Sequence, residues 1–148
     1  MPPAYVPDAG DIVWINFDPQ AGHEQAGHRP AVVLSPAAYN AKTSLMLCCP
    51  MTTQIKSYPF EVLIAGPSRS AVLADQIKSL DWRSRRAKRK GVVSPAELSE
   101  VRSKIRALIR SIFVHSISKI GAVANDIKKG ERFVPRSLSH RPSFSCGR

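Results

Sequence analysis

The feature that most constrains this fold is a series of short apolar segments rich in β-branched residues, each ended by proline, glycine or polar residues. Residues 11–17 (DIVWINF) and 30–34 (PAVVL) are the clearest, and both have the composition of β-strands. Further strands are predicted at residues 45–49, 60–64, 71–74, 76–80 and 91–93. Segments this short and this numerous favour a small β-domain.

Two segments predict helices. Ser35 and Pro36 are expected to supply the N-cap and first residue of a short helix over residues 37–41. Ser94, Pro95 and Glu97 have the pattern of a capping box, and apolar residues follow it at helical spacing: Leu98, Val101, Ile105, Leu108 and Ile109. The expected fold class is mainly β with helices (α+β), a small, partly open barrel backed by a C-terminal helix.

The charge balance points to an anionic partner. The 148 residues include 22 Lys and Arg against 11 Asp and Glu, a formal net charge of +11. Such an excess favours nucleic acid, an anionic membrane or an acidic protein. No apolar run approaches the roughly 20 residues that cross a bilayer, and no secretory signal pattern opens the sequence, so a cytoplasmic location without membrane contact is expected.

Neither a metal site nor a cofactor site is predicted. Cys48 and Cys49 are adjacent in a strand segment, where neighbouring side chains point to opposite faces, so both are expected to be reduced thiols packed as small hydrophobes. The sequence has no glycine-rich phosphate loop, zinc-binding histidine pair, nucleophile elbow or EF-hand spacing.

Two polar clusters emerge from the ends of apolar strands, which is how a rigid barrel presents a site. The first lies in the predicted loop 18–29 and the second in the segment 50–59. Their candidate functional residues are His23, Glu24, Gln25, His28 and Arg29 in the first, and Thr52, Thr53, Gln54, Lys56 and Ser57 in the second.

These residue types suit RNA cleavage by the 2′-hydroxyl, which needs a base, an acid and groups that stabilise the phosphorane. Glu24 is a candidate base, with His23 or His28 as the alternative base or acid. Arg29 suits charge stabilisation rather than proton transfer, because its pKa lies above about 12. Thr52 could donate to a phosphate oxygen. The structural alternatives are a surface ion pair for Glu24, turn capping for Thr52, and core positions for Trp14 and Phe60.

The residues also match a known family. The run EQAGHRP at 24–30, followed by PMTTQ at 50–54, closely resembles the MazF/PemK toxins of bacterial toxin–antitoxin modules. The resemblance covers about residues 4–110. It implies a CcdB-like, SH3-like barrel that forms a homodimer, binds an acidic MazE-like antitoxin and acts as a sequence-specific mRNA interferase. Cleavage of single-stranded RNA would need no metal and would leave 2′,3′-cyclic phosphate and 5′-hydroxyl ends, with an ACA-like target.

The family's catalytic residues correspond to Glu24, Arg29 and Thr52. Residues that line its RNA groove correspond to Gln25, His28, Thr53, Gln54, Lys56 and Ser57. His23 stands where close relatives often have Ser. The alternatives from other classes are a non-catalytic CcdB-like toxin and a basic nucleic-acid-binding module, against which the presence of both Arg29 and Thr52 argues.

Positive charge is concentrated in two places. Residues 82–90 (WRSRRAKRK) predict a basic loop that could steer phosphates. The segment 111–148 lies beyond the predicted domain, 1–110, and has seven Lys and Arg against two Asp and Glu. Its composition predicts a weakly ordered tail, either an RNA-attracting arm or a frameshifted or read-through terminus.

Overall fold

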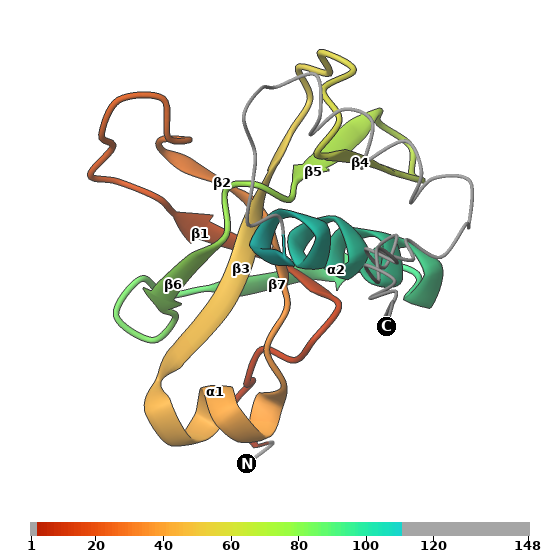
Figure 1. Ribbon diagram of the computed structural model, residues 1–148. Helices are drawn as coiled ribbons and strands as arrows, with labels where there is room; N and C mark the ends of the chain where they lie inside the picture. The colour runs from red at the N-terminus through yellow and green to blue at the C-terminus, as the bar shows by residue number, and fades with distance from the viewer. Residues whose placement is uncertain (1–2, 111–148) are drawn as a thin grey trace, which may run out of the picture.

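The computed structural model describes residues 3–110, where seven strands form one strongly curled sheet that α2 crosses on one face (Figure 1). The predictions for the segment 111–148 lie outside the described residues. The elements are β1 (Asp11–Asn16), β2 (His28–Val33), α1 (Ala37–Thr43), β3 (Leu45–Thr52), β4 (Glu61–Ile64), β5 (Ser70–Leu73), β6 (Lys78–Asp81), β7 (Lys88–Val92) and α2 (Pro95–Arg110). The predicted mainly β fold with a C-terminal helix is confirmed.

Strand β3 connects the two halves of the sheet. The strand order is β4-β5-β3-β2-β1-β7, and β6 pairs with β3 beside that path. The first half of β3 pairs with β6 through Leu45–Asp81, and its end pairs with β5 through Thr52–Ala71. All these pairings are antiparallel. The long strand therefore changes partners along its length, which bends the sheet into a partly open barrel.

The core has two parts, one on each face of the curled sheet. Cys49 packs in the part that includes Val101 and Ile105 of α2, whereas Cys48 packs in the part that includes Trp82. Both thiols are free and fully buried, which confirms the prediction of reduced, packed cysteines. Their division between the two clusters follows from the alternation of side chains along a strand.

The helix starts agree with the prediction for α2 and differ for α1. At α2 the Ser94 N–H donates to Glu97 Oε2 at 2.8 Å and the Glu97 N–H donates to Ser94 Oγ at 3.2 Å, which confirms the capping box. At α1 the N-cap is Pro36, which provides no side-chain cap, and the Ala37 N–H donates to Asp8 Oδ1 at 2.8 Å. The Ser35 hydroxyl instead bonds Asn40 Oδ1 at 2.6 Å, so its predicted capping role is wrong.

Three strand boundaries differ from the prediction in ways that matter for the site. β2 begins at His28, because His28 and Arg29 pair with Asn16 and Ile15 of β1. Pairing with β3 starts only at Ala31, so Pro30 lies where β2 has a single paired neighbour. β3 continues through Pro50 to Thr52, and the basic segment is a loop only as far as Ala87, after which it forms β7. No helix within residues 3–110 is long and apolar enough to cross a membrane.

Candidate functional site

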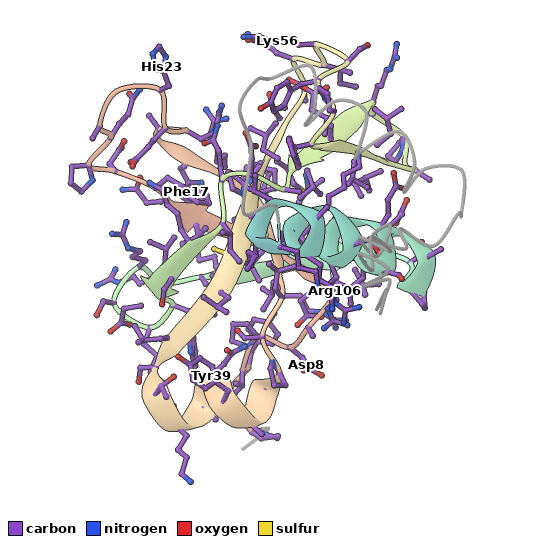
Figure 2. All side chains as sticks on the ribbon, in the orientation of Figure 1. Asp8, Phe17, His23, Tyr39, Lys56 and Arg106 are labelled. Atoms are coloured by element: carbon purple, nitrogen blue, oxygen red, sulfur yellow. The ribbon has the colours of Figure 1, made fainter. Side chains whose placement is uncertain are left out.

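A cavity of about 560 Å³ lies beside the ends of β2 and β3 and is lined by polar residues from both predicted clusters. His23 and Lys56 lie on the two loops that extend from this end of the molecule, whereas Tyr39 of α1 lies at the other end (Figure 2). Eight of the ten candidate residues line the cavity: His23, Gln25, His28, Arg29, Thr52, Thr53, Gln54 and Lys56. The fold therefore brings the two clusters together.

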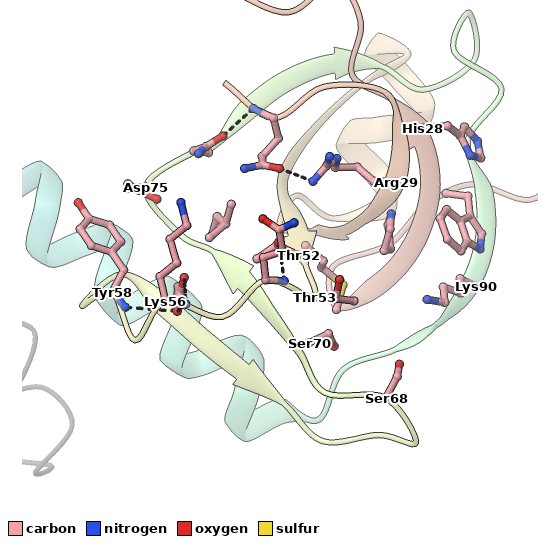
Figure 3. Close-up of a pocket in the computed structure, with 18 of the residues that line it drawn as sticks. His28, Arg29, Thr52, Thr53, Lys56, Tyr58, Ser68, Ser70, Asp75 and Lys90 are labelled. Atoms are coloured by element: carbon pink, nitrogen blue, oxygen red, sulfur yellow. Dashed lines mark hydrogen bonds between the residues drawn. The ribbon is translucent and has the colours of Figure 1, made fainter. Parts of the chain in front are cut away.

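Arg29 is held at the cavity wall by the loop that precedes it. Its Nε donates to the Ala26 carbonyl at 2.8 Å, and its Nη1 donates to Gln25 Oε1. The Gln25 N–H in turn donates to Gln76 Oε1 at 3.0 Å, across 51 residues of sequence. Two of the three guanidinium nitrogens thus have fixed partners. This arrangement orients a permanent positive charge toward the cavity that Arg29 and Thr52 share (Figure 3).

Thr52 ends β3, where its backbone pairs with Ala71 of β5. Its Oγ1 accepts the N–H of Gln54 at 3.1 Å. A hydroxyl that accepts in this way still has its own proton to donate, so Thr52 can offer an O–H to a ligand oxygen in the cavity.

The neighbouring loop is shaped by Glu61, which is 6% exposed. Its carboxylate accepts the N–H of Lys56 at 3.2 Å and that of Tyr58 at 3.3 Å. The Glu61 carbonyl accepts a 2.6 Å hydrogen bond from Lys104 of α2, a fully buried side chain. Helix α2 and β4 therefore determine where Lys56 and Tyr58 lie at the cavity.

Trp14 lies in the cavity wall between an aromatic neighbour, His28, and a cationic one, Lys90. Its ring stacks on His28 with centroids 5.5 Å apart and 4° between the planes, and Lys90 Nζ lies 4.6 Å from the Trp14 ring centroid. The predicted core position of Trp14 is wrong, because it alternates with the buried Val13 and Ile15 and so faces the other side of β1. The alternation of side chains along a strand could have predicted this from the sequence. Phe60 is buried, as predicted.

Glu24 and Ser57 are not among the residues that line the cavity. Glu24 is exposed, and its Oε2 forms a 2.7 Å salt bridge with Lys78 Nζ. The hydrogen bond from Lys78 lowers the pKa of Glu24 from its usual value. Ser57 adopts a φ of 57° at the turn of its loop. Their predicted roles therefore stay predictions.

The structure also adds residues that had no predicted role, among them Ser68, Ser70, Asp75 and Gln76, and it brings Lys90 of the predicted basic segment to the same cavity. Asp75 and Gln76 connect β5 to β6, and only the three-dimensional pairing of β5 with β3 brings them to the cavity. Burial raises the pKa of Asp75, and a hydrogen-bonding interaction with Tyr58 opposes that change. Within residues 3–110, no group of three or more His, Cys, Asp or Glu side chains could hold a metal ion.

Solved structures define the class. MazF (Form-I) from Deinococcus radiodurans has a TM-score of 0.69 and 56% identity, covering 72% of this chain and 98% of that chain. A MazE–MazF complex from the same organism has a TM-score of 0.65 and 56% identity, covering 72% and 97%. The protein is thus of the class of endoribonuclease toxins from toxin–antitoxin systems.

The particular family follows from the sequence. The endoribonuclease toxin MazF of Escherichia coli (strain K12) is 59% identical over 106 residues, 71% of this chain and 96% of that protein. Residues 8–109 match the profile of the PemK-like, MazF-like toxins of type II toxin–antitoxin systems. The chain belongs to this PemK/MazF family, which confirms the resemblance.

Proposed function

We propose that this toxin cleaves single-stranded mRNA by attack of a 2′-hydroxyl on the adjacent phosphate, leaving a 2′,3′-cyclic phosphate and a 5′-hydroxyl. The observation that carries the proposal is the fixed guanidinium of Arg29, which shares a cavity with the donor-competent hydroxyl of Thr52. Both groups can stabilise the negative charge that develops on the phosphorane oxygens. Because Arg29 supplies positive charge and the 2′-hydroxyl is the nucleophile, this chemistry needs no metal.

Glu24 is the proposed base for the 2′-hydroxyl. Its carboxylate forms a 2.7 Å salt bridge with Lys78, and neither residue lines the cavity, so the substrate has to compete with Lys78 for it. His23, next to it on the same loop, lines the cavity and is the alternative base or acid. The pH profiles of kcat for Glu24→Gln and His23→Asn separate the two, because loss of the base removes the rise of kcat with pH on the acidic side of the profile.

The remaining predicted residues are proposed to bind RNA around the cleaved phosphate. Lys56 contributes positive charge, and Gln25, His28, Thr53, Gln54 and Ser57 contribute polar contacts; an ACA-like target is proposed. The solved MazE–MazF complexes support an acidic antitoxin as the second partner, and its negative charge would complement the cavity cations. A homodimer in the cytoplasm, formed by a domain that spans residues 1–110, completes the proposal.

The test is incubation of the purified protein with a defined single-stranded RNA in excess EDTA. We expect discrete cuts with cyclic phosphate ends, and a decrease in kcat of about 10²–10³-fold in Arg29→Ala. Arg106→Ala, a change of the same type on the exposed side of α2, serves as the matched control and should cut normally. Intact RNA with folded wild-type protein would reject the proposal and favour a non-catalytic toxin. Truncation after Arg110 should leave cleavage unchanged.

A further inference from the structure

Two carboxylates line the cavity, and they differ in how they are used. Both oxygens of Glu61 accept backbone N–H groups, so Glu61 is a structural residue of its loop. Asp75 is half-buried and lies in the cavity wall beside Tyr58, whose side chain is also exposed to the cavity. Figure 3 shows this pair on the side of the cavity away from His28 and Lys90.

The charge of Asp75 limits what it can contact in bound RNA. A carboxylate repels the phosphates that the cavity cations Arg29, Lys56 and Lys90 attract. The ionised carboxylate can only accept hydrogen bonds, and it already has one with the Tyr58 side chain, so a further partner from RNA must be a donor. RNA offers donors on the base edges and on the 2′-hydroxyl. The adjacent Tyr58 ring is 38% exposed and provides a surface on which a base can stack.

We infer that Asp75 is a specificity-determining residue that accepts hydrogen bonds from the amino-bearing edge of one RNA base and thereby disfavours uracil at that position. The inference deepens the proposed function and rests on it. Adenine and cytosine present an exocyclic amine, and guanine presents adjacent N1–H and N2–H donors. The single N3–H of uracil lies between two carbonyl oxygens, both of which a carboxylate repels. Because Asp75 is half-buried, less water competes for this contact.

The test replaces Asp75 by Asn, whose amide can donate to the O4 of uracil while it keeps the shape of the side chain. Wild type and Asp75→Asn each cut a pool of RNA with randomised sequence, and the new 5′-hydroxyl ends are sequenced. We expect the wild type to exclude uracil from every position of an ACA-like site, and Asp75→Asn to decrease that discrimination about five-fold or more at one of these positions only. Asp75→Ala, which neither donates nor accepts, should lose the preference for amino-bearing bases.

Asp81→Asn is the matched control, because this carboxylate lies on β6 outside the cavity and bonds within its own turn, where it accepts the N–H of Ser84 at 2.8 Å. It should keep the wild-type preference. A second readout is the Kd for oligonucleotides that have 2′-deoxy sugars and so cannot be cut, with uracil or cytosine at the identified position. Asp75→Asn and Asp75→Ala should lower the ratio of the Kd for the uracil oligonucleotide to the Kd for the cytosine oligonucleotide. Asp81→Asn should leave this ratio unchanged.

The outcomes separate this inference from the proposed function. If Asp75→Asn and Asp75→Ala cut more slowly with unchanged base preference and unchanged Kd ratio, Asp75 serves the sugar or the chemistry and the inference is wrong. If Arg29→Ala still cuts while Asp75→Asn admits uracil, the proposed chemistry is wrong and the role of Asp75 stands. If the wild type does not cut at all, Kd values are measured with uracil or cytosine at each position of an ACA-like site in turn, and an unchanged ratio at every position in Asp75→Asn would reject the role of Asp75.

Discussion

Gln76 is expected to act on catalysis through Arg29 without touching it. Its Oε1 accepts the Gln25 N–H at 3.0 Å in a half-buried contact, and the Gln25 side chain accepts from Arg29 Nη1. A hydrogen bond of this kind contributes about 0.5–1.5 kcal/mol. Gln76→Ala removes this hydrogen bond from the loop that orients Arg29. The transition state, which needs Arg29 in that orientation, should then be destabilised by the same free energy. We therefore expect kcat to decrease by about 2- to 13-fold.

The substitution Gln76→Glu separates positioning from other roles. It keeps the acceptor for the Gln25 N–H but adds a negative charge to an RNA-binding cavity. For Gln76→Glu we expect kcat near the wild-type value and a raised KM. For Gln76→Ala we expect the reverse, a lowered kcat with KM near the wild-type value. Gln20→Ala removes a glutamine that bonds only locally, to the Gly22 carbonyl at 3.0 Å, and is the matched control.

The assay is steady-state cleavage of a short fluorogenic RNA, with folding checked by thermal melting. The Gln25→Ala variant loses a hydrogen bond to a charged group, worth about 1.5–3 kcal/mol, so its kcat should decrease by roughly 10- to 150-fold. Adding Gln76→Ala to Gln25→Ala should cost less than it does alone, because the side chain that Gln76 positions is already gone. Equal effects in both backgrounds would refute the positioning role.

Three further predictions concern stability and binding. Asp75→Asn should raise the Tm at pH 7. Burial raises the folded-state pKa of Asp75, so ionising Asp75 destabilises the folded protein increasingly as pH rises above the ordinary pKa of 3.8. Below pH 3.8 the increase in Tm from Asp75→Asn should vanish. Lys90→Gln should reduce the slope of log affinity for single-stranded RNA against log salt by about 0.7, and Lys42→Gln on α1 should not. Asn40→Ala should lower the free energy of unfolding by about 3 kcal/mol in urea titration, because three buried partners lose their hydrogen bonds.

Local signals predicted the fold well where one segment contains the whole cause. The capping box of α2 lies within four residues, and the runs with β-branched residues identified β1, β2, β4 and β5. Boundaries set by pairing were not predicted. His28 and Arg29 read as loop because their polarity hides the strand, yet the register with Asn16 and Ile15 extends β2 to include them. Tertiary pairing outweighs local composition at such positions.

The site was predicted in part for the same reason. The first polar cluster leads into β2 and the second follows β3, and the antiparallel pairing of these two strands brings the clusters to the same end of the sheet. Asp75 and Gln76 could not be placed, because their partners lie about 50 residues earlier or on another loop. The salt bridge of Glu24 with Lys78 likewise joins residues 54 positions apart. Only the folded chain shows these contacts.

The most direct test of cleavage by the 2′-hydroxyl is an RNA that contains a single 2′-deoxy sugar at the cut position. The proposed chemistry predicts no cleavage at that position, unchanged Kd, and normal cutting of the all-ribose RNA with a 2′,3′-cyclic phosphate end, all in excess EDTA. Cleavage next to the deoxy sugar, or a product that ends in a plain 3′-phosphate or 3′-hydroxyl from the start, would contradict it.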